Sequence, residues 1–149
     1  MHETNLRGPF LVTRACASHL RKNKMGRVIN ISAFIGLSAE GSSIAHATAK
    51  AGLIHLNRCL ASALAPDVTV NSIAPGLMEG TVMFEKISAE AVEAGRQRAK
   101  LNRHTSLEDV ADQVLTFCRA ESVTGQVLVI DGGIVSVSYT HLRAHETQR

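Results

Sequence analysis

Three short runs of aliphatic and β-branched residues, separated by longer helical segments, constrain the fold of this chain most strongly. They are RVINIS at residues 27–32, VTVNSIA at 68–74 and QVLVI at 126–130. Apolar runs of this length, flanked by glycine or proline, are typical of buried strands. Strands that alternate with helices form parallel crossover units. The sequence therefore predicts an α/β fold with three parallel strands.

The longer segments around these strands carry the signals of helices. We expect helices over residues 3–22, 43–64 and 106–119. Pro66 stops the second of them. Thr105 and Glu108 have the spacing of a capping box at the start of the third. Residues 81–103 are charged and weakly amphipathic, which predicts a short helix and a mobile segment.

Length and composition are those of one globular domain with an aliphatic core. The chain has 149 residues, of which 45% are hydrophobic but only 3% aromatic, so aliphatic side chains must fill the core. The formal charge is +3, and the basic residues form no long run. No zinc, homeodomain or RNA-binding signature is present. We therefore expect no nucleic-acid partner.

The three cysteines indicate a reducing compartment. Cys16, Cys59 and Cys118 are odd in number and widely spaced, and no CxxC or His/Cys cluster occurs, so no metal site is expected. Cys16 and Cys59 are interpreted as core thiols rather than nucleophiles. The sequence shows no secretory signal and no apolar run long enough to cross a bilayer. A cytoplasmic protein without a membrane partner is the simplest expectation.

The last residues differ in character from the rest of the chain. The string VSYTHLRAHET at residues 137–147 is similar to one reading frame of a transposon-end sequencing adapter. We therefore interpret residues 138–149 as a non-native tail and leave them out of the fold prediction. The alternative is a natural polar extension. His141 and His145 are not interpreted as metal ligands.

Several sequence pieces, in this order and at these spacings, resemble the short-chain dehydrogenase/reductase family. The resemblance is greatest to the branch of 3-oxoacyl-carrier-protein reductases. The pieces are Asn5-Leu6 with Phe10, GRVINIS, a helix with Lys50, VNSIAPG, SLEDVA and TGQVLVIDGG. The resemblance implies a Rossmann-like doubly wound parallel sheet, of which residues 1–137 would form the C-terminal part.

Two residues of the second predicted helix carry the chemistry that the resemblance implies. Lys50 lies four residues after His46, so both side chains share one helix face. In family enzymes the residue at position 46 is a tyrosine, whose hydroxyl exchanges a proton with the substrate. The lysine binds the nicotinamide ribose, and its positive charge lowers the tyrosine pKa.

The resemblance assigns roles to further positions. A serine thirteen residues before position 46 holds the substrate oxygen, and this chain has Ala33 there. The asparagine matching Asn5 kinks its helix and positions a water for proton relay. The segment that begins with Pro-Gly folds against the nicotinamide. The implied cofactor-binding positions are Lys50, Pro75, Gly76, Leu77, Met78 and Thr81.

Three positions depart from the family pattern, namely Ala33, His46 and Thr81, which lies one residue further along than usual. Ser32 cannot replace the missing serine if it belongs to the strand, because its side chain would point to the opposite face. His46 could transfer the proton, since histidine is a common general acid–base residue.

Two arguments oppose a catalytic His46. An imidazole nitrogen reaches roughly 2 Å less far than a tyrosine hydroxyl, and misplacement by about 1 Å can cost on the order of 100-fold in rate. The charge of Lys50 would also disfavour the imidazolium. The other interpretation is that His46 lines an altered pocket. His19, His55 and His104 lack partners at ligand spacing and are expected to be surface or hydrogen-bonded residues.

The implied function is hydride transfer between NAD or NADP and a carbonyl or alcohol substrate. The alternative is a non-catalytic relative that serves as a binding or oligomer-scaffold subunit. With either function, the resemblance implies a homo-dimer or homo-tetramer that forms through the two long helices. The glycine-rich GxxxGxG phosphate loop of the family does not occur in this sequence. We therefore expect the family's N-terminal half to be missing, and the chain alone to be inactive and unstable, with one strand edge unpaired.

Overall fold

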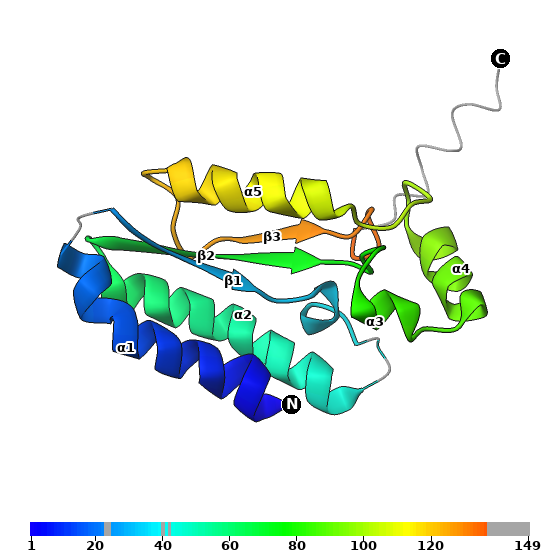
Figure 1. Cartoon of the computed structure of the whole chain (residues 1–149), viewed down its shortest axis with the longest axis horizontal. Helices are drawn as coiled ribbons and strands as arrows, with labels where there is room; N and C mark the ends of the chain where they lie inside the picture. The colour runs from blue at the N-terminus through cyan, green and yellow to red at the C-terminus, as the bar shows by residue number, and fades with distance from the viewer. Residues whose placement is uncertain (23–24, 40, 42, 137–149) are drawn as a thin grey trace, which may run out of the picture.

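The computed structural model describes residues 1–22, 25–39, 41 and 43–136, so the predicted tail at 138–149 lies outside the described residues. Its centre is a parallel sheet of β1 (Gly26–Ile31), β2 (Val68–Pro75) and β3 (Val127–Ile130), in the order β1-β2-β3 (Figure 1). Gly26 pairs with Val68, and Ser72 pairs with Val127. The predicted α/β class and its three parallel strands are confirmed, with each strand within a residue of its expected bounds.

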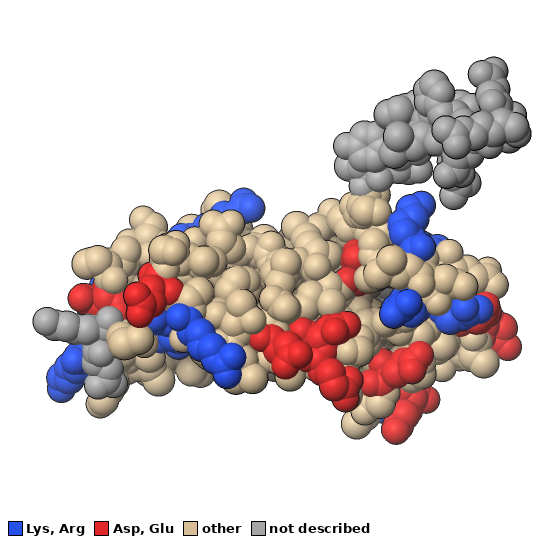
Figure 2. All heavy atoms as spheres, turned by 90° about the horizontal axis from the view of Figure 1, so that it is seen from above, with Lys and Arg blue, Asp and Glu red and all other residues tan. Residues whose placement is uncertain are grey.

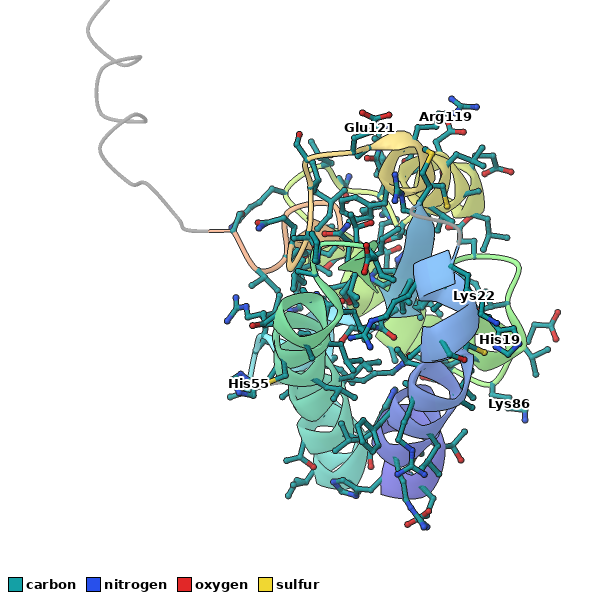
Figure 3. All side chains as sticks on the ribbon, turned by 90° about the vertical axis from the view of Figure 1, so that its left-hand side faces the viewer. His19, Lys22, His55, Lys86, Arg119 and Glu121 are labelled. Atoms are coloured by element: carbon teal, nitrogen blue, oxygen red, sulfur yellow. The ribbon has the colours of Figure 1, made fainter. Side chains whose placement is uncertain are left out.

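Helices cover both faces of the sheet. The long helices α1 (Gly8–Lys22) and α2 (Ile44–Leu64) lie side by side on one face, and α5 (Leu107–Arg119) covers the other (Figures 1 and 3). The main core cluster is aliphatic, as the composition predicted. It joins the end of α2 to the start of β2 and contains Leu60, Ala61, Leu64, Val68 and Val70.

The first predicted helix is interrupted near its start. A π-helical turn, η1 (Glu3–Arg7), precedes α1, and the backbone N–H of Gly8 bonds to the carbonyl of Glu3, five residues earlier. Pro9 has no N–H, so it cannot donate the ordinary helical bond to the carbonyl of Asn5. This missing bond explains why the wider turn lies at Asn5.

Serine residues cap the N-termini of the other two long helices. Ser43 caps α2, because its Oγ accepts a 3.3 Å hydrogen bond from the backbone N–H of His46. Ser106 caps α5 in the same way through Asp109, at 2.9 Å. The predicted capping box at Thr105 is therefore wrong by one residue. Thr105 instead donates a 2.6 Å bond to the carbonyl of Ile130.

The segment between β2 and α5 contains two helices where the sequence predicted one. They are α3 (Val82–Glu85) and α4 (Ala89–Arg98), which lie beyond the carboxyl ends of the strands (Figure 1). Thr81 caps α3, and Ser88 caps α4 through the backbone N–H of Ala91, at 3.3 Å. Each cap satisfies a backbone donor that would otherwise lack a partner at the helix start.

A buried polar network joins the sheet to α2. Asn57 is fully buried, accepts a 3.2 Å hydrogen bond from Asn30 of β1, and donates one of 3.2 Å to the carbonyl of Gln126. Ser72 of β2 donates to the carbonyl of Asn30 at 3.0 Å. Asn71 donates to the carbonyl of Val123 at 2.8 Å. These bonds satisfy polar groups that would be costly to bury unpaired.

The surface differs from expectation at the cysteines. All three are free thiols and all are exposed, so the interpretation of Cys16 and Cys59 as core residues is wrong. On the face seen in Figure 2, the largest group of acidic side chains lies near and to the right of the middle, and both acidic and basic side chains lie toward the two ends. Within the described residues, β1 pairs only with β2, which leaves its other edge open as expected.

No helix in the described part of the chain is long and apolar enough to cross a membrane.

Candidate functional site

A cavity of about 360 Å³ lies at the carboxyl ends of β1 and β2. It brings together five of the residues singled out from the sequence: Ala33, His46, Pro75, Gly76 and Leu77. They come from three separate elements, namely the end of β1, the first turn of α2 and the end of β2. Ligands of open α/β sheets bind beyond the carboxyl ends of the strands. This cavity is therefore the candidate site.

The remaining walls of the cavity are mostly apolar. They come from the turn after β1, from the α3–α4 segment and from the residues after β3. The side chains and glycines concerned are Phe34, Ile35, Gly41, Met83, Ile87, Ala91, Gly95, Arg98 and Ile134. Sequence reasoning missed Met83, Ile87 and Arg98, because no local motif marks which face of a short helix meets a distant strand.

Ser32 and Ala33 point in different directions at the end of β1. The side chain of Ser32 is buried, and its Oγ donates a 3.0 Å hydrogen bond to the backbone carbonyl of Lys50. Ala33 lines the cavity with a methyl group, which can neither donate nor accept a hydrogen bond. Ser32 therefore ties β1 to α2 and does not line the cavity.

Lys50 is half-buried beneath the site. Its Nζ donates a 2.8 Å hydrogen bond to the carbonyl oxygen of Ile31, and Lys50 does not line the cavity. Burial lowers the pKa of Lys50, because desolvation disfavours the charged ammonium. Two of its three N–H donors remain beyond the bond to Ile31.

His46 lies in the first turn of α2 and borders two hollows. One is the cavity above, and the other, of about 470 Å³, also meets Met1 and Lys86. Burial lowers the pKa of His46, and the nearby charge of Lys50 lowers it further. The direction expected from Lys50 is therefore confirmed. A neutral imidazole offers one N–H donor and one acceptor nitrogen.

Besides Lys50, three predicted residues lie outside the cavity wall: Asn5, Met78 and Thr81. The side chain of Asn5 donates a 3.1 Å bond to the carbonyl of Met1. The hydroxyl of Thr81 donates to the carbonyl of Met78 at 2.9 Å and accepts from the backbone of Phe84 at 3.2 Å. Thr81 thus braces the entry into α3.

Gly76 is held where a larger residue would not fit. Its N–H bonds to the carbonyl of Ile130 at 2.8 Å and to Oγ1 of Thr105 at 3.1 Å. A Cβ at this position would lie 2.8 Å from the same Oγ1 and 3.0 Å from Cα of Asp131. Thr105 and Asp131 are thus supporting residues that the sequence did not reveal. The buried Asp131 carboxylate in turn accepts two backbone N–H groups, each at 2.8 Å.

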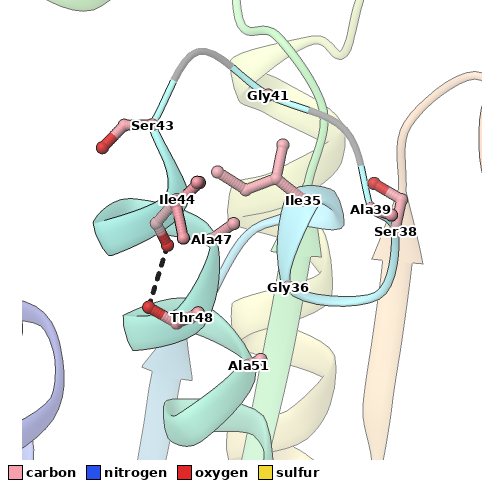
Figure 4. A pocket seen from close by; sticks show the side chains of 10 residues that line it. All are labelled: Ile35, Gly36, Ser38, Ala39, Gly41, Ser43, Ile44, Ala47, Thr48 and Ala51. Carbon is pink, nitrogen blue, oxygen red and sulfur yellow. Dashed lines mark hydrogen bonds between the residues drawn. The ribbon is translucent and has the colours of Figure 1, made fainter.

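Another hollow, separate from the two that His46 borders, has a volume of about 270 Å³ and lies between η2 (Phe34–Gly36) and the start of α2 (Figure 4). Ile35 and Gly41 border both this hollow and the candidate site. The Thr48 hydroxyl points back along α2, where it donates a 2.8 Å bond to the carbonyl of Ile44. Besides Thr48, the polar residues that line this hollow are Ser38 and Ser43, and the remaining residues are small or apolar.

The histidines outside the site differ in their environments. His19 and His55 are exposed on α1 and α2, as expected (Figure 3). His104 is half-buried, packs edge-on against Phe84 with ring centroids 5.5 Å apart, and its Nε2 is buried with no partner among the described residues. The expectation of a surface or hydrogen-bonded His104 is therefore wrong. No group of three potential metal ligands occurs in the described ranges.

Comparison with known proteins gives consistent similarities. Residues 1–135 match the family model described as enoyl-(acyl carrier protein) reductase. A 3-oxoacyl-[acyl-carrier-protein] reductase of Aquifex aeolicus is 38% identical over 135 residues, which are 89% of this chain and 54% of that protein. The chain thus spans about half the length of this relative.

One shorter relative is matched almost throughout. The short-chain dehydrogenase/reductase homolog YusR of Bacillus subtilis is 31% identical over 136 residues, covering 86% of this chain and 98% of that protein. Among solved structures, FolM alternative dihydrofolate reductase 1 from Brucella canis, complexed with NADP, superposes with a TM-score of 0.82 at 27% identity. That match covers 93% of this chain and 54% of the other. The predicted Rossmann-like fold is confirmed by this similarity.

Proposed function

Because the chain belongs to the short-chain dehydrogenase/reductase family, we propose that it forms the substrate-binding part of an NAD(P)-dependent oxidoreductase. The reaction is hydride transfer between a nicotinamide cofactor and a carbonyl or alcohol substrate. The observation that carries the proposal is the cavity that joins Ala33, His46 and Gly76 at the carboxyl ends of β1 and β2. The catalytic positions are Asn5, Ala33, His46 and Lys50.

The residues present fit the nicotinamide end of NAD or NADP, which would donate the hydride in its reduced form and accept it in its oxidised form. The Lys50 ammonium retains two N–H donors, which suit ribose hydroxyls. Pro75 and Gly76 both line the cavity, so a planar ring could lie against them. The remaining cofactor-binding positions are Leu77, Met78 and Thr81. The phosphate end has no glycine-rich loop in this sequence.

His46 takes the place of the proton-transferring group. Burial and then the charge of Lys50 lower its pKa, which favours the neutral imidazole; its unprotonated nitrogen can accept a proton, but as a weaker base than an ordinary histidine. During alcohol oxidation the substrate hydroxyl proton would pass to this nitrogen, and the hydride on the carbon that bears this hydroxyl would pass to the oxidised nicotinamide. Ala33 gives the substrate oxygen no hydrogen bond, and Lys50 opposes the resulting imidazolium. We therefore expect slow turnover.

The second candidate is a non-catalytic subunit that binds ligands or holds an oligomer together. The apolar methyl of Ala33 and the shorter side chain of His46 favour it at the site. On α1, Val12 is 64% exposed, and Phe10 is also exposed. Such apolar side chains favour association of the long helices in a homo-dimer or homo-tetramer. A cytoplasmic location stays a prediction, which the free thiols favour.

Activity separates the two candidates. The protein encoded by the full reading frame containing this sequence would be assayed for oxidation of NADH and NADPH with a panel of ketones, and for the reverse reaction with alcohols. We expect turnover that Lys50→Met abolishes and that Arg58→Gln, an exposed change on the same helix, leaves intact. Absence of turnover with every substrate, despite cofactor binding, would favour the non-catalytic subunit.

A further inference from the structure

The candidate cavity contains one strongly cationic side chain. Among the described residues that line it, Arg98 alone carries a full charge at neutral pH. The neighbours of Arg98 along the wall are apolar or small, and the second polar side chain is His46. The cavity is therefore an apolar space with one positive group at its edge.

Helix α4 supplies this charge from a single face. Ala91, Gly95 and Arg98 all line the cavity and are spaced four and three residues apart, so they lie one above another along the helix. Ala91 and Gly95 are small and leave room beside the helix for a ligand. Arg98 is the last residue of α4. This face of α4 therefore offers space for the apolar part of a ligand beside Ala91 and Gly95, and the positive charge of Arg98 lies at its end.

Arg98 is suited to recognise an anion. A guanidinium has five N–H donors in a planar fork that matches a carboxylate, so it can hold a ligand in addition to its interaction within the protein. Met83 and Ile87 border the same cavity, and the Arg98 side chain is exposed at its edge.

We infer that the substrate of this cavity is a ketone, or its alcohol, with an apolar body and a carboxylate that Arg98 binds. This inference rests on the proposed function and deepens it by naming the substrate class. It assigns Arg98 as a specificity-determining residue. The carbonyl oxygen would lie toward His46, and the carboxylate toward the end of α4.

Binding experiments test the inference directly. Calorimetry on the protein of the full reading frame would use linear methyl-ketone carboxylates of increasing length and their methyl esters. We expect the best carboxylate to bind about 10- to 100-fold more tightly than its ester, as for a charge-assisted hydrogen bond. Arg98→Gln should remove this preference and leave the ester affinity unchanged. Arg98→Lys, which keeps the charge but loses the fork, should retain part of it.

Arg103→Gln is the matched control. It removes the same charge from an exposed residue that borders neighbouring hollows but not this cavity. Equal weakening by Arg98→Gln and Arg103→Gln would show general attraction of anions and overturn the inference. Equal binding of acid and ester by the unaltered protein, or no binding of any acid, would also overturn it.

Activity assays distinguish a failure of this inference from a failure of the proposed function. Reduction of neutral ketones with no preference for carboxylates would support an oxidoreductase and reject the role of Arg98. Arg98-dependent binding of carboxylates without any turnover would support the role of Arg98 in ligand recognition and reject the oxidoreductase. Circular dichroism of each variant would confirm that the fold is intact.

Discussion

Lys50 and Ile31 are joined by a 2.8 Å hydrogen bond from the ammonium group of the lysine to the carbonyl oxygen at the end of β1. A second bond runs in the opposite direction, from Oγ of Ser32 to the carbonyl of Lys50, at 3.0 Å. Together they fix α2 against the strand immediately before Ala33. Since His46 lies one turn before Lys50, this pair of bonds also sets where the imidazole meets the cavity.

Removing the ammonium group should change the titration of His46. The Lys50 charge lowers the pKa of His46, although burial contributes more. We expect Lys50→Met to raise the His46 pKa part of the way toward its ordinary value, as followed by NMR of the imidazole. Arg58→Gln, on an exposed face of α2, should leave it unchanged. An unaltered His46 pKa in Lys50→Met would show that the lysine charge does not reach the imidazole.

The stability of the fold should decline in mild acid because of His46. Its pKa is lower in the folded chain than the unfolded value of about 6.5, so the unfolded chain binds the proton more readily. The stability due to this difference is present in full above that unfolded value. It is lost as the pH falls toward the folded pKa.

Urea unfolding at neutral and mildly acidic pH measures this effect. His46→Gln should show a smaller loss of stability on acidification than the unaltered chain. His55→Gln, an exposed change on the same helix, should keep the full loss. The same pH dependence in all three proteins would mean that groups other than His46 cause the decline.

A side chain at position 36 should disrupt the packing of the turn after β1 on α2. A Cβ there would lie 2.8 Å from the backbone nitrogen of Ala51, a distance that real contacts do not reach. We expect Gly36→Ala to lower the free energy of unfolding by about 1–3 kcal/mol, as for overpacking. In Gly95→Ala the nearest contact of the new Cβ would be 3.6 Å, to the ring of His104, so this variant should be neutral or slightly stabilised. Urea denaturation of both variants compares them, and similar stabilities would contradict the prediction.

The elements that the sequence predicted are those with a local signal. Strands appeared as aliphatic runs, Pro66 marked the end of α2, and the spacing of Lys50 and His46 placed both on one helix face. The failures came where the signal is non-local or ambiguous. Thr105 and Ser106 are adjacent hydroxyls that can each cap a helix, and the choice depends on Ile130, which accepts the bond from Thr105.

The candidate site was only partly predictable for the same reason. Ala33, His46 and Gly76 belong to sequence motifs, so their convergence at the cavity could be expected. Arg98 belongs to no motif, and its place in the wall depends on how α4 folds back over the strands. The bond from Lys50 to Ile31 could not be predicted either. Helical spacing shows which face of α2 carries Lys50, but not which atom of β1 lies opposite its ammonium group.

The buried asparagine at position 57 should be important for stability. Its side chain bonds to Asn30 and to the carbonyl of Gln126, each at 3.2 Å. Asn57→Ala would leave the buried Asn30 amide without this partner, whereas the carbonyl of Gln126 keeps a 2.9 Å bond from the backbone N–H of Ser72, so we expect a loss of about 1–3 kcal/mol. Urea denaturation measures the change. Ser62→Ala, at an exposed position of the same helix, should have little effect, and an equally small effect of Asn57→Ala would show that water replaces the lost bonds.

His104 offers the opposite case, in which removing a polar side chain should stabilise the fold. Its ring packs edge-on against Phe84, while its buried Nε2 lacks a hydrogen-bond partner among the described residues. Burying an unpaired polar nitrogen costs about 1–3 kcal/mol, whereas an apolar side chain of similar size avoids that cost. We therefore expect His104→Leu to raise the free energy of unfolding by about 1 kcal/mol, with part of the gain offset by loss of the aromatic contact. His19→Leu, at an exposed position, should give no such gain. A lower stability of His104→Leu in thermal and urea unfolding would show that the imidazole makes a bond in solution that outweighs its burial.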